Sequence, residues 1–109
     1  MTALSLHLTK IGNGDFLLEP SRSLNIRDQS RHIENITAHL LQARASRLYY
    51  DLSSLALIDP LYYSWLDALA RAAQAVNVKM ICINMQPTAA FALSKFLQKK
   101  PVFETAHTI

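Results

Sequence analysis

The spacing of hydrophobic residues along the chain changes several times, and each change marks a different kind of element. The segment LSLHLT at 4–9 alternates apolar and polar residues, as a half-buried strand does. VKMICIN at 78–84 is instead a continuous apolar run, which is typical of a strand buried on both faces. Other stretches repeat their apolar residues every three or four positions, as a helix with one buried face does.

These patterns predict elements in the order β-β-α-β-α-β-α-β. The expected strands lie at 4–9, 16–19, 47–55, 78–84 and 102–105, the third of them passing into a loop, and the expected helices at 26–44, 60–76 and 87–99. The Asn-Gly pair in IGNGD, at 11–15, favours a hairpin turn between the first two strands. The alternation of strands and helices that follows implies right-handed crossovers. We therefore expect an α/β fold with a mixed, mostly parallel sheet of about five strands.

The helix expected at 60–76 divides clearly into an apolar and a polar face. At about 100° per residue, one arc holds the residues that should face the core, namely Leu61, Tyr62, Trp65, Leu66, Leu69, Ala72, Ala73 and Val76. On the polar face, Asp67 and Arg71 are spaced to form an ion pair. Tyr63 falls on that face too. It is either an ordinary exposed tyrosine or a contact for a partner, because aromatic residues are enriched at binding hot spots.

Asp59 and Pro60 form the expected start of the same helix. An aspartate is a favoured N-cap, because its carboxylate accepts hydrogen bonds from unpaired N–H groups of the first turn. Proline is favoured at the first helical position, where its missing N–H removes no hydrogen bond. Local structure alone is therefore enough to explain this pair.

Composition and charge narrow the class of protein. A chain of 109 residues, half of them hydrophobic and 17% charged, suits one folded domain. The net charge is only +3, and the one lysine cluster, at 95, 99 and 100, falls near the expected end of a helix, where cations offset the dipole. This pattern indicates no nucleic-acid surface. No apolar run is long enough to span a membrane and the N-terminus lacks an export signal, so we expect a cytoplasmic protein.

Residues suited to catalysis or metal binding are scattered along the chain. Two glycines cannot build a phosphate-binding loop, no serine lies in a G-x-S-x-G motif, and the four histidines have no partner at ligand spacing. Asp51 and Asp59 are a weak candidate for an acid–base pair. Cys82, the one cysteine, lies in an apolar run and should be a buried, unreactive thiol. We expect neither an enzyme nor a cofactor or metal site.

Three segments resemble STAS domains, the fold of anti-sigma-factor antagonists. YYDLSSLALIDPLYYSWLDALARAA at 49–73 is similar to their central stretch, which reads strand, Asp-Leu-Ser/Thr, Ile-Asp, phospho-acceptor hydroxyl and long helix. VKMICINMQPTAAFAL at 78–93 resembles the next strand and turn in stressosome proteins of the RsbS and RsbR type. VFETAHTI at 102–109 is similar to their closing strand. The resemblance extends from residue 4 to about residue 108.

The resemblance implies a non-catalytic module that switches between protein partners. Such domains bind a serine/threonine kinase, an anti-sigma factor or other STAS proteins, and phosphorylation at the helix start changes that binding. A phosphate would add close to two negative charges at the edge of the docking surface. It would also lie at a helix N-terminus, where the backbone dipole tolerates an anion.

The sequence departs from the family pattern at several positions. Pro60 occupies the phospho-acceptor position, and Ala92 the position of a second threonine that some stressosome proteins use, so neither site can be phosphorylated. Asn84 replaces the usual glycine before Met85. The chain also stops near residue 109, where family members add one more helix. We therefore expect a single STAS domain, 1–109, without that helix, and self-association that covers the exposed part of the sheet.

Two functions follow as hypotheses. The first is a regulatory interaction module of the stressosome or anti-anti-sigma type whose usual switch has been replaced. Because turns that follow successive parallel strands should be neighbours, its expected docking surface consists of Asp59, Pro60, Tyr63, Ser64, Met85, Gln86 and Thr88. The alternative phosphorylation sites nearest to it are Ser53, Ser54 and Ser64. The second hypothesis is an accessory subunit of a lipid or anion transporter, which the lysine cluster would support.

Overall fold

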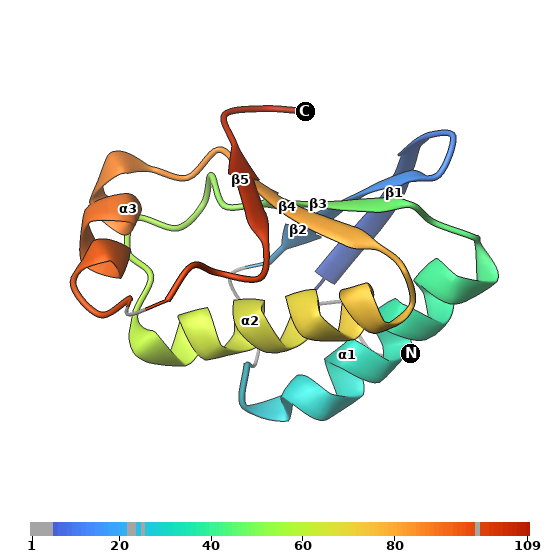
Figure 1. The fold of residues 1–109 in the computed structure, drawn as a ribbon, viewed down its shortest axis with the longest axis horizontal. Coiled ribbons are helices and arrows are strands. Elements are labelled where there is room, and N and C mark those ends of the chain that lie inside the picture. Colours follow the sequence, from blue (N-terminus) through green and yellow to red (C-terminus); the bar gives the residue numbers. More distant parts are fainter. Residues whose placement is uncertain (1–5, 22–23, 25, 98) are drawn as a thin grey trace.

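The computed structural model describes residues 6–21, 24, 26–97 and 99–109. Its strands are β1 (Leu6–Gly12), β2 (Asp15–Pro20), β3 (Arg47–Asp51), β4 (Lys79–Ile83) and β5 (Glu104–Ala106). Its helices are α1 (Gln29–Gln42), preceded by the short 3-10 helix η1 (Ile26–Asp28), α2 (Pro60–Ala75) and α3 (Pro87–Ser94). The predicted order of elements is confirmed (Figure 1).

The five strands form one sheet in the order β1-β2-β3-β4-β5. β1 and β2 pair antiparallel as the predicted hairpin, and every later pair is parallel, so the expected mixed sheet is confirmed. Gly14 has a φ of 84° in the hairpin turn, a conformation that glycine adopts without strain. Its carbonyl accepts hydrogen bonds from the N–H groups of Ser46 and Arg47, which joins the hairpin turn to the start of β3.

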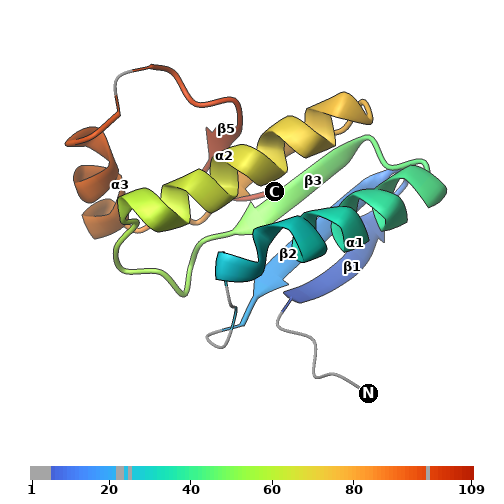
Figure 2. The ribbon, with the colours of Figure 1, turned by 90° about the horizontal axis from the view of Figure 1, so that it is seen from below.

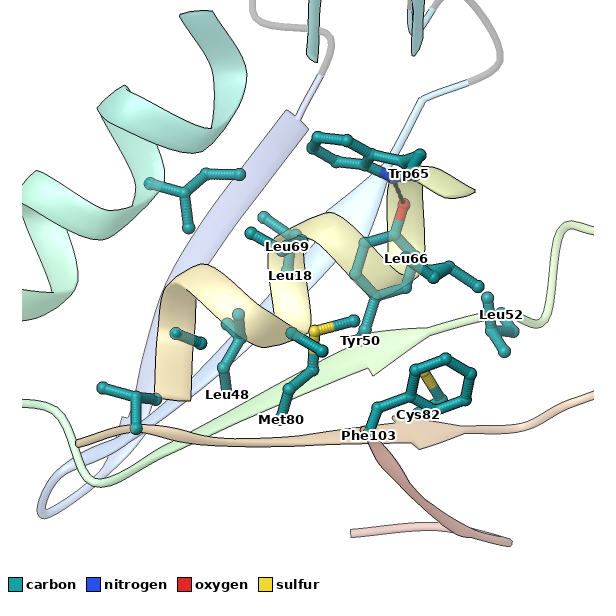
Figure 3. Close-up of a cluster of buried hydrophobic side chains, with 14 of the residues drawn as sticks. Leu18, Leu48, Tyr50, Leu52, Trp65, Leu66, Leu69, Met80, Cys82 and Phe103 are labelled. Carbon is teal, nitrogen blue, oxygen red and sulfur yellow. Dashed lines mark hydrogen bonds between the residues drawn. The ribbon is translucent and has the colours of Figure 1, made fainter. Parts of the chain in front are cut away.

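Helices α1 and α2 lie side by side against one face of the sheet, whereas α3 lies at one end of it (Figures 1 and 2). The main core fills the space between the sheet and these two helices (Figure 3). Alternate side chains of the central strands, Leu48 and Tyr50 on β3 and Met80 and Cys82 on β4, point into it. The other face carries a small cluster of Tyr49, Ile81 and Ile83, with Leu17 packed against it. The continuous apolar run of β4 therefore serves both faces.

Helix α3 is shorter than the sequence predicts, because it ends at Ser94 and not at residue 99. The chain turns there, and Phe96 and Leu97 pack against the core. The proline at 101 therefore does not end the helix. Lys95 is the C-cap of α3, whereas Lys99 and Lys100 lie beyond it, so the helix dipole accounts for only one of the three lysines.

The predicted faces of α2 are mostly right. Trp65, Leu66, Leu69 and Ala73 are buried, and Arg71 Nε lies 2.9 Å from Asp67 Oδ2, as expected, whereas Ala70 is buried without having been predicted. Leu61 is an exception, because its side chain is 48% exposed. It lies in the first turn, beyond the part of the helix that packs on the sheet.

Candidate functional site

The start of α2 has the local structure that the sequence predicts. Asp59 is the N-cap, and its Oδ1 accepts a hydrogen bond of 2.7 Å from the N–H of Tyr62. Pro60 occupies the first turn, where a proline removes no hydrogen bond. Both side chains are exposed, so the residue that fixes the start of the helix also lies at the surface.

The loop before this helix start is hydrogen-bonded to the turn that begins α3. Gln86 Nε2 donates to the carbonyl of Ser53 at 2.7 Å, and the hydroxyl of Thr88 donates to the carbonyl of Ala56. The helix start at 59–60 and the turn at 84–88 therefore lie together, at the carboxyl ends of β3 and β4. Gln86 and Thr88, both expected to bind a partner, already use a polar group within the chain.

Asn84 has a structural role at the end of β4. Its φ is 59°, in the left-handed region that glycine and asparagine tolerate best. The asparagine therefore supplies the backbone conformation that the resemblance assigns to a glycine. Its Nδ2 also donates to Asp51 Oδ1 at 3.2 Å, and the same oxygen accepts from the N–H of Ser53 at 2.9 Å. Asp51 thus orders the loop between β3 and α2, and this explains the residue without acid–base chemistry.

An open groove of about 670 Å³ runs between the start of α2 and α3. It is lined by Leu57, Ile58, Asp59, Pro60, Pro87, Thr88, Phe91, Ala92, Lys95 and Phe96. Pro60 and Ala92, the two residues where the resemblance leads us to expect hydroxyl groups, lie in this same groove. Its walls are mostly apolar, as those of binding pockets usually are.

Tyr63 is not the exposed aromatic residue that the sequence predicts. Its side chain is half-buried, and its ring makes edge-on contacts with Phe96 at 5.7 Å and with Phe103 at 6.0 Å between centroids. Both aromatic partners lie in the segment that follows α3 and leads to β5. Burial, followed by the charge of Asp67, raises the pKa of Tyr63. Tyr63 is therefore a packing residue close to the groove.

The other predicted site residues differ in exposure. Ser53, Ser54 and Ser64 are exposed. Met85 is half-buried and packs against the core, which leaves little of it for a partner. Of the predicted docking surface, Asp59, Pro60, Ser64 and Thr88 are the exposed members.

A buried hydrogen-bonded network, which the sequence analysis missed, supports the first turns of α2. Trp65 Nε1 donates to the hydroxyl of Tyr50 at 2.8 Å, and that oxygen lies 2.6 Å from the hydroxyl of Tyr62 (Figure 3 shows the Trp65–Tyr50 bond). Burial raises the pKa of Tyr50 well above its usual value and raises that of Tyr62 to about 12. Both phenols therefore stay neutral. The spacing of Tyr62 and Trp65 on one helical face was the available signal.

The described part of the chain holds no cluster of three His, Cys, Asp or Glu side chains placed to bind a metal ion. The ring of His32 packs edge-on against Trp65, and that of His39 against Phe16. Cys82 is buried, and burial raises its pKa, so the thiol is protonated and inaccessible, as predicted. Among the residues that the structure describes, no helix is both long and apolar enough to cross a membrane.

Comparisons with known proteins agree with this fold. No family model matches the chain, and no curated protein matches its sequence.

Three solved structures, each 15% identical, are similar in fold. A variant of RsbS from Moorella thermoacetica has a TM-score of 0.75, covering 95% of this chain and 87% of its own. A stressosome structure has a TM-score of 0.77, covering 94% and 89%. The anti-sigma factor antagonist SpoIIAA, in its unphosphorylated form, has a TM-score of 0.65, covering 95% and 89%. The chain therefore has the STAS fold that its sequence motifs predict.

Proposed function

We propose that this chain is a non-catalytic regulatory module of the stressosome or anti-anti-sigma type, which binds protein partners at the groove between α2 and α3. The observation that supports the proposal is the identity of two residues that line this groove. Pro60 and Ala92, at the two positions where the resemblance leads us to expect phospho-acceptors, both line it, and neither has a hydroxyl. The groove is where a phosphate would act, but these two residues cannot accept one.

The physical consequence is a docking surface with one state. A phosphate at residue 60 would bring close to two negative charges to an apolar groove beside Asp59. Such a group would oppose an apolar partner through the cost of desolvating its charge. With proline in its place the surface keeps its apolar character, and binding does not respond to a kinase at this position. The expected partners are a serine/threonine kinase, an anti-sigma factor or other STAS proteins.

Substitution of Pro60 by serine tests this proposal. Serine is tolerated in a first helical turn, so we expect Pro60→Ser to fold with a loss of about 1 kcal/mol or less. Incubation with the host's partner-switching kinase and ATP, followed by mass spectrometry, should show one added phosphate on residue 60. The natural chain should remain unmodified. Captured partners should bind the natural chain more tightly than phosphorylated Pro60→Ser.

Pro60→Ala is the matched control, because it removes the same ring without adding a hydroxyl. Phosphate on Ser53, Ser54 or Ser64 of the natural chain would contradict a permanently unswitched surface. Recovery of a transporter permease, in place of a kinase or an anti-sigma factor, would favour the role of a transporter accessory subunit.

A further inference from the structure

The groove between α2 and α3 exposes more apolar surface than the fold requires. Leu57 is 64% exposed and Phe91 is 65% exposed, and both line the groove. Leu61, which follows Pro60, is 48% exposed. Large apolar side chains that gather in this way on a small domain usually mark a binding surface. These residues come from the loop before α2, from α2 and from α3, so the surface depends on the folded arrangement of the three segments.

The groove carries one charge of each sign, Asp59 on the side of α2 and Lys95 on the side of α3. The carboxylate of Asp59 already caps α2, and the hydroxyl of Thr88 already donates to a backbone carbonyl. Lys95 remains, with its ammonium 4.6 Å from the centroid of the Phe91 ring. Lys99 and Lys100 are exposed a few residues further along the chain. An occupant therefore meets an apolar floor with a cationic edge on the side of α3 and a carboxylate on the side of α2, and acidic side chains complement the edge at Lys95.

The segments that line the groove are helices and loops, so the groove has no strand edge with which an extended peptide could pair. Pro60 and Pro87 have no N–H, and the carbonyls of Asp59 and Gln86 accept hydrogen bonds within their own helices. An extended peptide would bring an unpaired N–H and C=O with nearly every residue. A helix pairs these groups internally and presents only side chains. A helix therefore fits this groove better than a strand does.

We propose that the groove binds an amphipathic helix of a partner protein, with its apolar stripe in the groove and acidic residues beside Lys95. This inference rests on the proposed function, because it takes the partner to be a protein. The groove receives apolar side chains spaced i, i+3, i+4 and i+7, as helix-binding grooves do. The cationic edge fixes which flank of the helix is acidic, and so sets its orientation.

Three synthetic peptides of 18 residues test the proposal. The first carries leucines at the helical spacing and glutamates on one flank. The second has lysines in place of the glutamates, and the third has the first composition in scrambled order. Fluorescence anisotropy with the natural chain at physiological salt should show the acidic peptide binding at least fivefold more tightly than the basic one. The scrambled peptide should not bind.

Substitutions of groove residues test whether the peptide binds in the groove. Phe91→Ala should weaken binding of the acidic peptide about tenfold, and Lys95→Glu should reverse the preference between acidic and basic peptides. Leu41→Ala is the matched apolar control, since Leu41 is 61% exposed in the last turn of α1, away from α3. Lys10→Glu makes the same charge change on β1. Neither control should change the affinity by more than twofold.

Several outcomes would overturn the inference. Equal affinity for the acidic and basic peptides would show that Lys95 does not select the peptide. A loss of affinity with Leu41→Ala equal to that with Phe91→Ala would show that the peptide does not bind in the groove. Sedimentation with phosphatidylserine vesicles that depends on Phe91 and Lys95, without peptide binding, would make the surface a membrane contact. A kinase or anti-sigma factor that binds Phe91→Ala more weakly than the natural chain, although no helical peptide binds, would leave the proposed function standing and reject only the helix.

Discussion

At the scale of single residues, Asp59 and Pro60 determine both where α2 begins and which chemical groups line the groove. The aspartate accepts the hydrogen bond that starts α2, and the proline lies at a helical position that costs it nothing. The same proline lies in an apolar groove without a hydroxyl. The residue that suits the start of the helix therefore also leaves this position of the groove without a hydroxyl. We therefore expect Pro60→Ser to change the surface of the groove more than the stability of the chain.

Tyr63 is the residue whose role the structure changes most, and the change can be measured. Because its ring packs against Phe96 and Phe103, we expect Tyr63→Ala to lower the free energy of unfolding by about 2 kcal/mol. Tyr63→Phe keeps the ring and should cost far less. Ser64→Ala, at the exposed neighbouring position, should change stability by about 0.5 kcal/mol or less. Urea denaturation of the three variants checks these values.

If Tyr63→Ala instead unfolded at the same urea concentration as the natural chain, its aromatic contacts would contribute nothing. Tyr63 would then be an exposed residue, as the helical spacing predicts, and could again be considered as a contact for a partner. A loss of stability equal to that of Ser64→Ala would have the same meaning.

At the scale of elements, the network of Tyr50, Tyr62 and Trp65 joins β3 to the first turns of α2. Its polar atoms are buried or partly buried between the sheet and the helix, and each has a hydrogen-bond partner within the network. Such a network favours one placement of the helix, because any other would leave a buried hydroxyl unpaired. It therefore holds the helix start, and with it one wall of the groove.

The network predicts a loss of stability in alkali. An unfolded tyrosine ionises near pH 10, whereas the pKa of Tyr62 in the fold is about 12. Between these values the unfolded chain has lost a proton that the folded chain keeps, so the free energy of unfolding falls as the pH rises. The slope is about 1.4 kcal/mol per pH unit for each such tyrosine. Urea denaturation between pH 9 and 12 should show it.

Tyr62→Phe separates this tyrosine from the rest of the chain. At pH 7 the variant should lose about 1 kcal/mol, the usual net value of one hydrogen bond. Above pH 10 its stability should fall less steeply than that of the natural chain, by about 1.4 kcal/mol per pH unit. Identical slopes would mean that Tyr62 ionises in the folded state as easily as in the unfolded chain.

Which elements the sequence predicts depends on how local their causes are. The hairpin follows from Gly14 and the start of α2 from Asp59 and Pro60, and each cause lies within the element. The end of α3 does not, because it depends on Phe96 turning back to contact Tyr63, some thirty residues earlier in the chain. Helix propensities depend on local sequence and contain no information about that contact. The predicted docking surface includes Asp59, Pro60 and Thr88, which line the groove, but the lining residues from other segments, such as Leu57 and Phe91, were missed.

At the scale of the whole molecule, the buried contacts are distributed unevenly. The helix α2 buries five side chains, from Trp65 to Ala73, whereas α3 buries only Ala89 and Leu93. The hydrogen bonds from Gln86 and Thr88 that join α3 to the rest of the chain are exposed to water. Regions with few buried contacts open more easily than the core. The groove therefore has one firmly held wall and one weakly held wall.

This difference predicts the pattern of amide hydrogen exchange. We expect the amides of α3 to exchange at least tenfold faster than those of α2, because opening α3 breaks fewer buried contacts. Mass spectrometry of peptides from 60–75 and 87–94 measures both helices in one experiment. Thr88→Val, which removes one exposed hydrogen bond, should speed exchange in α3 and leave α2 unchanged. Equal protection of the two helices would mean that α3 opens only when the whole domain unfolds. A ligand held between the two walls should slow exchange chiefly in α3, since that wall has the most protection to gain.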